Sequence, residues 1–326
     1  MRRRIDLAEA RSMLLSRAQL DESGVTERQL QSDLSARRLI RVHRGSYVSS
    51  LHWNALWWEG QHLLKVLAVR AASAGDGPIF THTSAAVLWG LPMFRTGARP
   101  VQTLLETKRH SRTEVDVVRR DMRVDAMDIV EVDGVRLTSR RRTVFDVART
   151  QSFESSLCCA DAELRRVAVD RYRTDADAEA GWRENLMQLA VPGLRGVRQA
   201  RRIIEFADGR AQLPGESVSR AHLRTLGFSR YDLQVPVTGT EGERYWVDFA
   251  FRGSRRFGEF DGEGKYTDPD LRDTPSAHAA VLAEKRREDD IRGVTGWSFA
   301  RWGNEHIRTA DALGARLAAF GIHPPG

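Results

Sequence analysis

The 326-residue sequence has few cysteines, few lysines and no long apolar run. Its two cysteines, Cys158 and Cys159, are adjacent, which excludes a disulfide framework and a Cys-x-x-Cys metal knuckle. No segment approaches the roughly 18 uninterrupted apolar residues that a membrane span needs. The basic start, Met1 to Asp6, is not followed by the apolar core of a signal peptide. We therefore expect no membrane association and a reducing, cytoplasmic location.

Lysine accounts for only 4 of the 51 basic residues, and arginine supplies the other 47. The net charge is +7, and arginine suits phosphate because its planar guanidinium donates two parallel hydrogen bonds. A genome rich in GC would produce the same bias toward arginine. The charge therefore permits a polyanionic partner without proving one.

Length and composition place the chain among globular proteins. At about 150 residues per domain, the chain suggests two domains with room for a third small module. Hydrophobic residues make up 41% and charged residues 29% of the sequence. This is the balance of a soluble folded protein and not of a disordered one.

The first fifty residues predict two helices separated by a break. Residues 5–15 have the apolar spacing of a helix, and Gly24 then interrupts the chain. Thr26 and Gln29 form the two ends of a capping box, which predicts a second helix that begins just after Thr26.

A basic hairpin follows the capped helix. Residues 39–43 and 46–49 alternate as strands, and Arg44-Gly45 supplies the turn between them. This order is the layout of a winged helix-turn-helix, in which the capped helix enters the major groove and the wing contacts phosphates or the minor groove. Winged helices also bind proteins, but the exposed basic face favours double-stranded DNA. The side chains expected to contact DNA are Arg28, Gln31, Arg37, Arg38, Arg41 and Arg44.

Residues 51–190 predict a domain of mixed α and β structure, without residues at catalytic spacing. His82 and Ser84 are two residues apart at the start of a short helix, and we interpret both as structural. Short strands are expected at residues 101–105, 115–118, 129–132 and 135–137.

Three stretches in the first half of the chain resemble the AbiEi family of bacterial antitoxins, the antitoxin half of type IV toxin–antitoxin pairs. They are residues 24–30 with 44–47, residues 81–92, and residues 137–139 with 142–146. The resemblance implies a DNA-binding winged helix followed by an α/β domain, often with an autoregulatory role. It also raises a cognate toxin as a possible partner.

After a basic linker helix at residues 194–206, the C-terminal part has a regular order of elements. The sequence predicts one helix, three strands, a long charged helix, a further strand and a closing helix. These lie at residues 216–226, 233–237, 245–251, 256–260, 276–292, 297–302 and 304–320.

Acidic residues interrupt two of these strands. Asp248 lies between apolar neighbours, and Glu259 and Asp261 alternate with Phe260, while Glu216 begins the preceding helix. A lone carboxylate in an apolar strand costs several kcal/mol to bury, whereas grouped carboxylates are ligands for Mg²⁺ or Mn²⁺. Such a metal would activate water for attack on a phosphate, and Lys265 or Lys285 would supply positive charge nearby. The alternative for Glu259 and Asp261 is a charged sheet edge that blocks aggregation.

The ordered pattern over about residues 210–310 resembles the PD-(D/E)xK nucleases, and among them the very-short-patch-repair-endonuclease-like group. The resemblance implies that Asp248 and Glu259 bind the metal, that Glu216 is an accessory acid, and that Gln234 is a polar residue near the site. One position departs from the family, because Asp261 stands where the usual lysine would be. Either Lys265 or Lys285 replaces that lysine, or the site has lost full activity.

We therefore expect an α/β (α+β) multidomain protein in three parts. These are a winged helix-turn-helix at 1–50, an AbiEi-like α/β domain at 51–190, and a linker helix with an αβββαβ restriction-endonuclease-like domain at 191–326. The first functional hypothesis is a DNA-binding protein with a metal-dependent endonuclease domain. The alternatives are a non-catalytic repressor or type IV antitoxin, and a purely protein-binding role.

Overall fold

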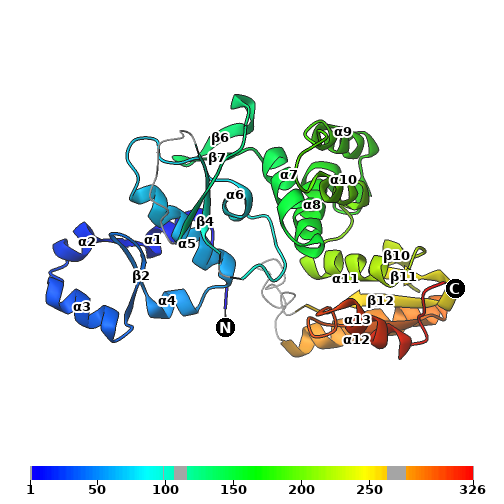
Figure 1. Cartoon of the computed structure of the whole chain (residues 1–326). Coiled ribbons are helices and arrows are strands. Elements are labelled where there is room, and N and C mark those ends of the chain that lie inside the picture. Colours follow the sequence, from blue (N-terminus) through cyan, green and yellow to red (C-terminus); the bar gives the residue numbers. More distant parts are fainter. Residues whose placement is uncertain (1, 98, 106–115, 263–276, 326) are drawn as a thin grey trace. The chain divides into compact units, whose positions relative to one another are not determined.

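The computed structural model describes residues 2–97, 99–105, 116–262 and 277–325 (Figure 1). The chain divides into two compact units. Unit 1 comprises Met1–Ser152 and Arg183–Ile204, and unit 2 comprises Phe153–Trp182 and Glu205–Gly326. Helices and several small sheets occur in both units, so the predicted mixture of α and β structure is confirmed.

Unit 1 contains a small N-terminal module, which we call the head (residues 2–54), and an α/β part. The elements of the head are α1 (Leu7–Met13), β1 (Leu15–Ser16), α2 (Arg17–Glu22), α3 (Glu27–Ser35), β2 (Leu39–His43), β3 (Ser46–Ser49) and α4 (Ser50–Asn54). Those of the α/β part are α5 (Trp58–Ala71), α6 (His82–Leu88), β4 (Val101–Leu104), β5 (Val117–Arg120), β6 (Ile129–Val132), β7 (Val135–Thr138) and α7 (Arg140–Thr150). Two further helices, α9 (Ala176–Met187) and α10 (Val197–Phe206), run across the boundary between the units.

Helix α3 begins where the sequence predicts it. The Thr26 hydroxyl accepts the Gln29 backbone N–H, and the Gln29 side chain accepts the Thr26 backbone N–H, so the capping box is confirmed. Leu30, on the inner side of α3, is buried with Leu20 and Tyr47 in the core of the head. This core fixes α3 against α2 and the hairpin of β2 and β3.

The structure differs from the prediction for residues 5–22. The helix predicted at 5–15 is shorter, and strand β1 and helix α2 follow it. The physical reason is a second capping box, in which Ser16 and Gln19 exchange hydrogen bonds and start α2. Strand β1 pairs with β3, and the three strands of the head have the order β1-β3-β2.

The α/β part of unit 1 encloses a buried polar cluster. The His62 Nε2 lies 2.9 Å from the Ser84 hydroxyl, which also accepts the Gln102 backbone N–H at 2.8 Å. Phe80 forms one isolated β-bridge with Thr103 on β4 and another with Leu137 on β7. The two hydrogen bonds of Ser84 connect α6 to α5 and to β4. They agree with the interpretation of Ser84 as a structural residue.

We expect the stability of unit 1 to fall in mild acid. Burial lowers the pKa of His62 and of His82 to about 4, below the roughly 6.5 of an exposed histidine. The unfolded chain therefore binds more protons below pH 6.5, and stability is lost as the pH falls from there toward 4. Between pH 8 and pH 5 each histidine should remove about 2 kcal/mol from the free energy of unfolding.

Urea titrations at these two pH values measure the loss. Asparagine tolerates the positive φ of 50° at position 82, so the H82N variant should show a smaller loss at pH 5 than the wild type. An equal pH dependence in wild type and H82N would show that His82 titrates normally.

Unit 2 contains a helical layer and a four-stranded sheet. Its elements, besides α9 and α10, are α8 (Phe153–Ala168), β8 (Val169–Asp170), β9 (Arg173–Thr174), α11 (Pro214–Thr225), β10 (Asp232–Thr238), β11 (Arg244–Phe251), β12 (Arg256–Phe260), α12 (Ala277–Thr295), β13 (Ser298–Trp302) and α13 (Ala310–Ala318). The predicted order of helix, three strands, helix and strand is confirmed.

The sheet of unit 2 has the strand order β10-β11-β12-β13. The first three strands are antiparallel, and β13 is parallel to β12 because α12 carries the chain back to the same end. Helix α11 covers one face, where the Trp302 indole N–H donates to Ser219. Helix α12 covers the other face (Figure 1), and there Ile291 packs with Val247 and Phe299.

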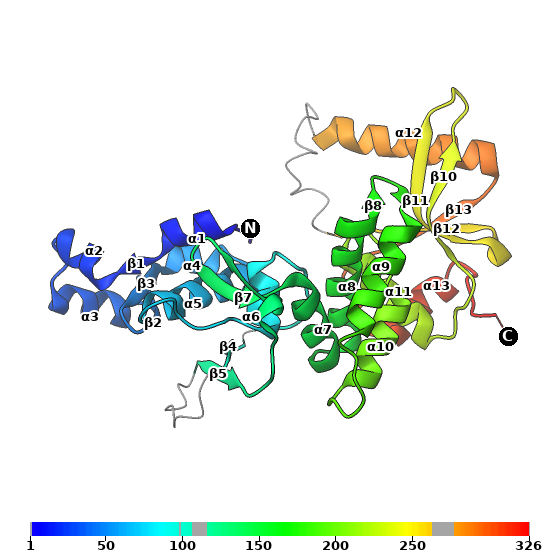
Figure 2. The ribbon, with the colours of Figure 1, turned by 90° about the horizontal axis from the view of Figure 1, so that it is seen from above.

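Two further contacts anchor the elements around this sheet. Arg220 on α11 forms a buried ion pair with Asp161 on α8, and the second Asp161 oxygen accepts the Asp208 backbone N–H at 2.8 Å. The β8–β9 hairpin lies beside β11 (Figure 2), and its Tyr172 stacks on Trp246 of β11 with ring centroids 3.9 Å apart. Within the described ranges, none of the helices combines the length and apolar composition needed to cross a bilayer.

Candidate functional site

All six side chains predicted to contact DNA are exposed on the head. Arg28 and Gln31 are on α3, Arg37 and Arg38 follow it, and Arg41 and Arg44 belong to the hairpin of β2 and β3. Arg28, Gln31 and Ser35 lie on the side of α3 opposite to the buried Leu30. The head therefore presents a polar helix face and a basic turn to the solvent.

The six residues differ in whether their side chains already have a hydrogen-bond or ion-pair partner within the protein. Arg38 pairs with Asp33, and the Gln31 amide donates to Glu27 at 2.8 Å. The side chains of four arginines make no hydrogen bond or ion pair with any residue that the structure describes, and we call them the head arginines: Arg28, Arg37, Arg41 and Arg44. Their guanidinium groups can bind an anion without first breaking an ion pair with a described residue.

In unit 2, the predicted acids lie where two strands of the sheet separate. Strands β11 and β12 pair from Phe251↔Arg256 to Phe249↔Gly258, and the pairing ends there. The next residue of β11 is Asp248, whose carboxylate accepts the Phe260 backbone N–H at 3.0 Å. Beyond the last backbone pair, the Asp248 side chain therefore supplies the hydrogen bond that links β11 to β12.

Gln234 connects Asp248 to Glu216. Its Nε2 donates to one oxygen of each carboxylate at 3.3 Å, and its own carbonyl accepts from the Gln212 amide at 3.1 Å. Gln234 has a φ of 48° within β10, a left-handed conformation that costs on the order of 1–2 kcal/mol. Strain of this kind gathers at functional sites, and here it accompanies an amide that bridges two acids.

Glu259 is held by two arginines. It is 2% exposed, and its Oε1 accepts from Arg287 of α12 at 2.8 Å. Its Oε2 lies 3.0 Å from an Arg301 nitrogen, as an ion pair without hydrogen-bond geometry. Burial raises the pKa of Glu259, the two arginines oppose this, and the negative charge of Asp248 adds to it. The two acids therefore lie close enough to repel each other.

The remaining predicted residues lie apart from the pair of acids. Asp261 is exposed and 3.4 Å from Arg301. Lys285 is exposed on α12, on a side different from Glu284 and Arg287. Lys265 lies outside the residues that the structure describes. Among the described residues, the cations that contact Glu259 are arginines and not the lysine expected from the nuclease resemblance.

The described carboxylates fit their present partners better than a divalent cation. Mg²⁺ needs carboxylate oxygens that are free to coordinate it. Both Asp248 oxygens accept N–H groups, and both Glu259 oxygens face guanidinium groups. In the described part of the chain, no group of three or more His, Cys, Asp or Glu side chains could hold a metal ion. In this arrangement nitrogen donors hold both carboxylates, and the described side chains by themselves do not form a site for Mg²⁺ or Mn²⁺.

Sequence reasoning missed the two arginines. Arg301 is the parallel partner of Glu259 across β12 and β13, and Arg287 reaches Glu259 from the helix that connects these strands. Arg301 also lies 2.6 Å from Glu284 and 3.0 Å from Glu288. The available signal was the spacing of Glu284, Arg287 and Glu288, which places all three on one side of a helix.

Comparison with known proteins gives relatives but no activity. Two proteins of Mycobacterium tuberculosis, from strain CDC 1551 / Oshkosh and strain ATCC 25618 / H37Rv, are each 27% identical to this chain over 295 residues. The match covers 90% of this chain and 96% of each relative, and both are named only as uncharacterized proteins. No family model matches the chain. The similarity extends over parts of both units and assigns neither a ligand nor a reaction.

Proposed function

We propose that the chain is a DNA-binding regulator whose head contacts double-stranded DNA. The observation that carries this proposal is the set of four head arginines, whose side chains are exposed beside a polar face of α3 and have no partner among the described residues. The order of elements in the head supports it, because α2 and α3 are followed by a β2–β3 hairpin, as in a winged helix. Helix α3 would enter the major groove, and the turn at Arg44 would contact the backbone.

In this proposal, unit 2 has a nuclease-like sheet but serves as a binding platform. The support is the pairing of Glu259 with Arg287 and Arg301, and of Asp248 with Gln234 and the Phe260 backbone. The two arginines offset the charge of Glu259, and neutral N–H donors satisfy the oxygens of Asp248, so these contacts hold both acids in place without a metal. A repressor or antitoxin would require no catalysis from this unit.

A second candidate function is phosphodiester hydrolysis by unit 2. The specific observation in its favour is that Asp248 and Glu259 come from two neighbouring strands at the point where these separate. For hydrolysis, the arginines and the Gln234 amide would have to leave the carboxylates so that Mg²⁺ could bind there. The repressor requires no such rearrangement, and the geometry therefore supports it better.

A cleavage assay separates the two candidates. We expect the purified protein to bind a duplex from the region upstream of its own gene, and not to nick it in the presence of Mg²⁺ or Mn²⁺. The D248N variant keeps the size of the side chain and should bind the duplex as the wild type does, because Asp248 is not part of the head. Gel electrophoresis of supercoiled DNA detects nicking, and a binding isotherm measures affinity.

Each possible result of this assay supports one candidate. Metal-dependent nicking by the wild type that D248N abolishes would replace the regulator with the hydrolase. Nicking that persists in D248N would come from a contaminating nuclease, and the regulator would stand. Absence of binding to any duplex would refute the DNA-binding proposal itself.

A further inference from the structure

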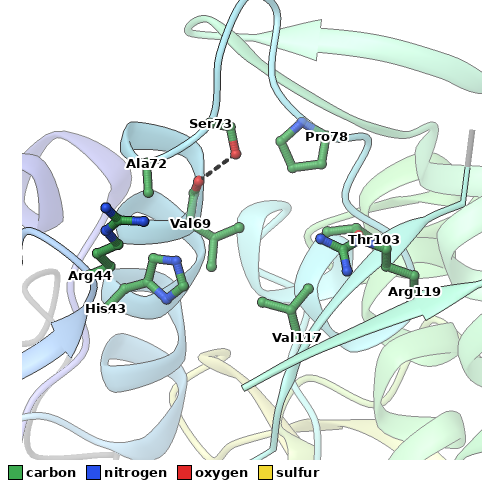
Figure 3. Close-up of a pocket in the computed structure, with 9 residues that line it drawn as sticks. All are labelled: His43, Arg44, Val69, Ala72, Ser73, Pro78, Thr103, Val117 and Arg119. Atoms are coloured by element: carbon green, nitrogen blue, oxygen red, sulfur yellow. Dashed lines mark hydrogen bonds between the residues drawn. The ribbon is translucent and has the colours of Figure 1, made fainter. Parts of the chain in front are cut away.

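A pocket of about 370 Å³ lies within unit 1, between the hairpin of the head and the parallel strands β4 and β5. His43 and Arg44 form one wall, together with the C-terminal end of α5 (Figure 3). Arg119 on β5 lies on the opposite wall, near Thr103. Segments that are far apart in the sequence thus meet around one cavity.

The charge of this pocket is positive. Among the nine described residues that line it there are two arginines and one histidine, and none of these nine is an aspartate or a glutamate. The Arg44 side chain makes no hydrogen bond or ion pair with a described residue, whereas Arg119 is half-buried and already interacts with another group. An arginine carries five N–H donors, so the guanidinium groups of Arg44 and Arg119 can both donate hydrogen bonds to an anion in this cavity.

The remaining lining is apolar and limits the size of a ligand. Val69 and Val117 lie between the two walls, and Pro78 lies at one end of the pocket (Figure 3). The Ser73 hydroxyl donates to the Val69 backbone carbonyl at 2.7 Å, so its proton is already used. The volume is at the lower end of the range for pockets that hold small molecules. The lining thus combines charge at two walls with a short aliphatic surface.

We propose that this pocket binds a small dianion with an aliphatic body, an organic phosphate or a dicarboxylate, and that the bound anion weakens DNA binding by the head. The second part rests on the proposed function, because Arg44 is both a lining residue and a head arginine. A guanidinium that is bound to a small anion is neutralised and no longer attracts a DNA phosphate. Because the two ligands share Arg44, each lowers the affinity of the other by the same factor.

The first experiment measures anion binding without DNA. Isothermal titration of the full chain at constant low ionic strength would use glycerol 3-phosphate and succinate, with glycerol as the neutral control. We expect saturable one-to-one binding of at least one of the two anions and none of glycerol, and the anion that binds identifies the phosphate or carboxylate source. R119Q should weaken binding at least about tenfold, whereas R171Q, at an exposed arginine of unit 2, should have no effect. No saturable binding of either anion, or equal binding by R119Q, would overturn the proposal.

The second experiment measures the coupling to DNA. With the anion at about ten times its dissociation constant and the ionic strength held fixed, the apparent affinity for duplex DNA should fall about threefold in the wild type, because one of the four head arginines is neutralised, and much less in R119Q. Unchanged DNA affinity would refute the regulatory part of the inference. Binding of the anion by a protein that binds no DNA would refute the proposed function and leave the pocket assignment intact.

Discussion

Replacing the four head arginines by glutamine is expected to reduce the affinity for duplex DNA by at least about a hundredfold. The side chains of Arg28, Arg37, Arg41 and Arg44 are exposed and have no described partner, so these substitutions remove positive charge without breaking a described ion pair. Each arginine that binds a phosphate releases condensed counterions. The slope of log affinity against log salt should therefore become shallower by about 0.9 for each phosphate that is no longer neutralised. Titrations of a fluorescent duplex at several salt concentrations measure both quantities.

A matched variant controls for the general reduction in charge. Arg171, Arg173, Arg230 and Arg244 are four exposed arginines of unit 2 whose side chains have no described partner. Replacing these four by glutamine changes the net charge by the same amount and should leave the salt dependence nearly unchanged. If this control weakens binding as much as the head variant does, the DNA-binding surface does not lie on the head.

The substitution R287M is expected to lower the free energy of unfolding of unit 2 by about 3–5 kcal/mol. Arg287 is the hydrogen-bonded partner of Glu259, whose side chain is 3% exposed. Removing one member of a buried pair leaves the other charge without a full partner in a poorly solvated site. Arg301 still faces Glu259, but without hydrogen-bond geometry, so it compensates only in part. Urea unfolding followed by tryptophan fluorescence measures the change.

The same helix provides the control. Arg292 pairs with Glu288 at 2.8 Å, but the arginine side chain is 47% exposed. An exposed pair of this kind contributes at most about 1 kcal/mol, so R292M should be close to neutral. Equal destabilisation by the two variants would mean that methionine disturbs α12 itself and that the buried pair has no special weight.

The head shows which features can be predicted from interactions between residues that are close in the sequence. The capping box of Thr26 and Gln29 depends on hydrogen bonds between residues three apart, and it appears in the structure as predicted. The same signal occurs at Ser16 and Gln19, where it starts α2. The helix predicted over residues 5–15 is present but shorter, at Leu7–Met13, because apolar spacing does not show where a helix begins or ends.

The acids of unit 2 illustrate the limit of this reasoning. Alternation within strands indicates that Asp248 and Glu259 interrupt apolar patterns, and both lie at the separation of β11 and β12. Their partners are not predictable in the same way. Arg301 meets Glu259 through a parallel strand register, and Arg287 through the rotation of α12. The spacing of Glu284, Arg287 and Glu288 places them on one side of a helix, but it does not show which strand that side meets.

The sequence by itself determined the local structure of this protein: where capped helices begin, which strands alternate, and which head arginines are exposed. These features depend on hydrogen bonds and side-chain periodicity over a few residues, which the order of amino acids specifies directly. Only the tertiary structure decided that arginines face Glu259, and that Arg44 and Arg119 line one pocket. Such contacts join segments that are distant in the chain, and packing of the whole unit brings them together.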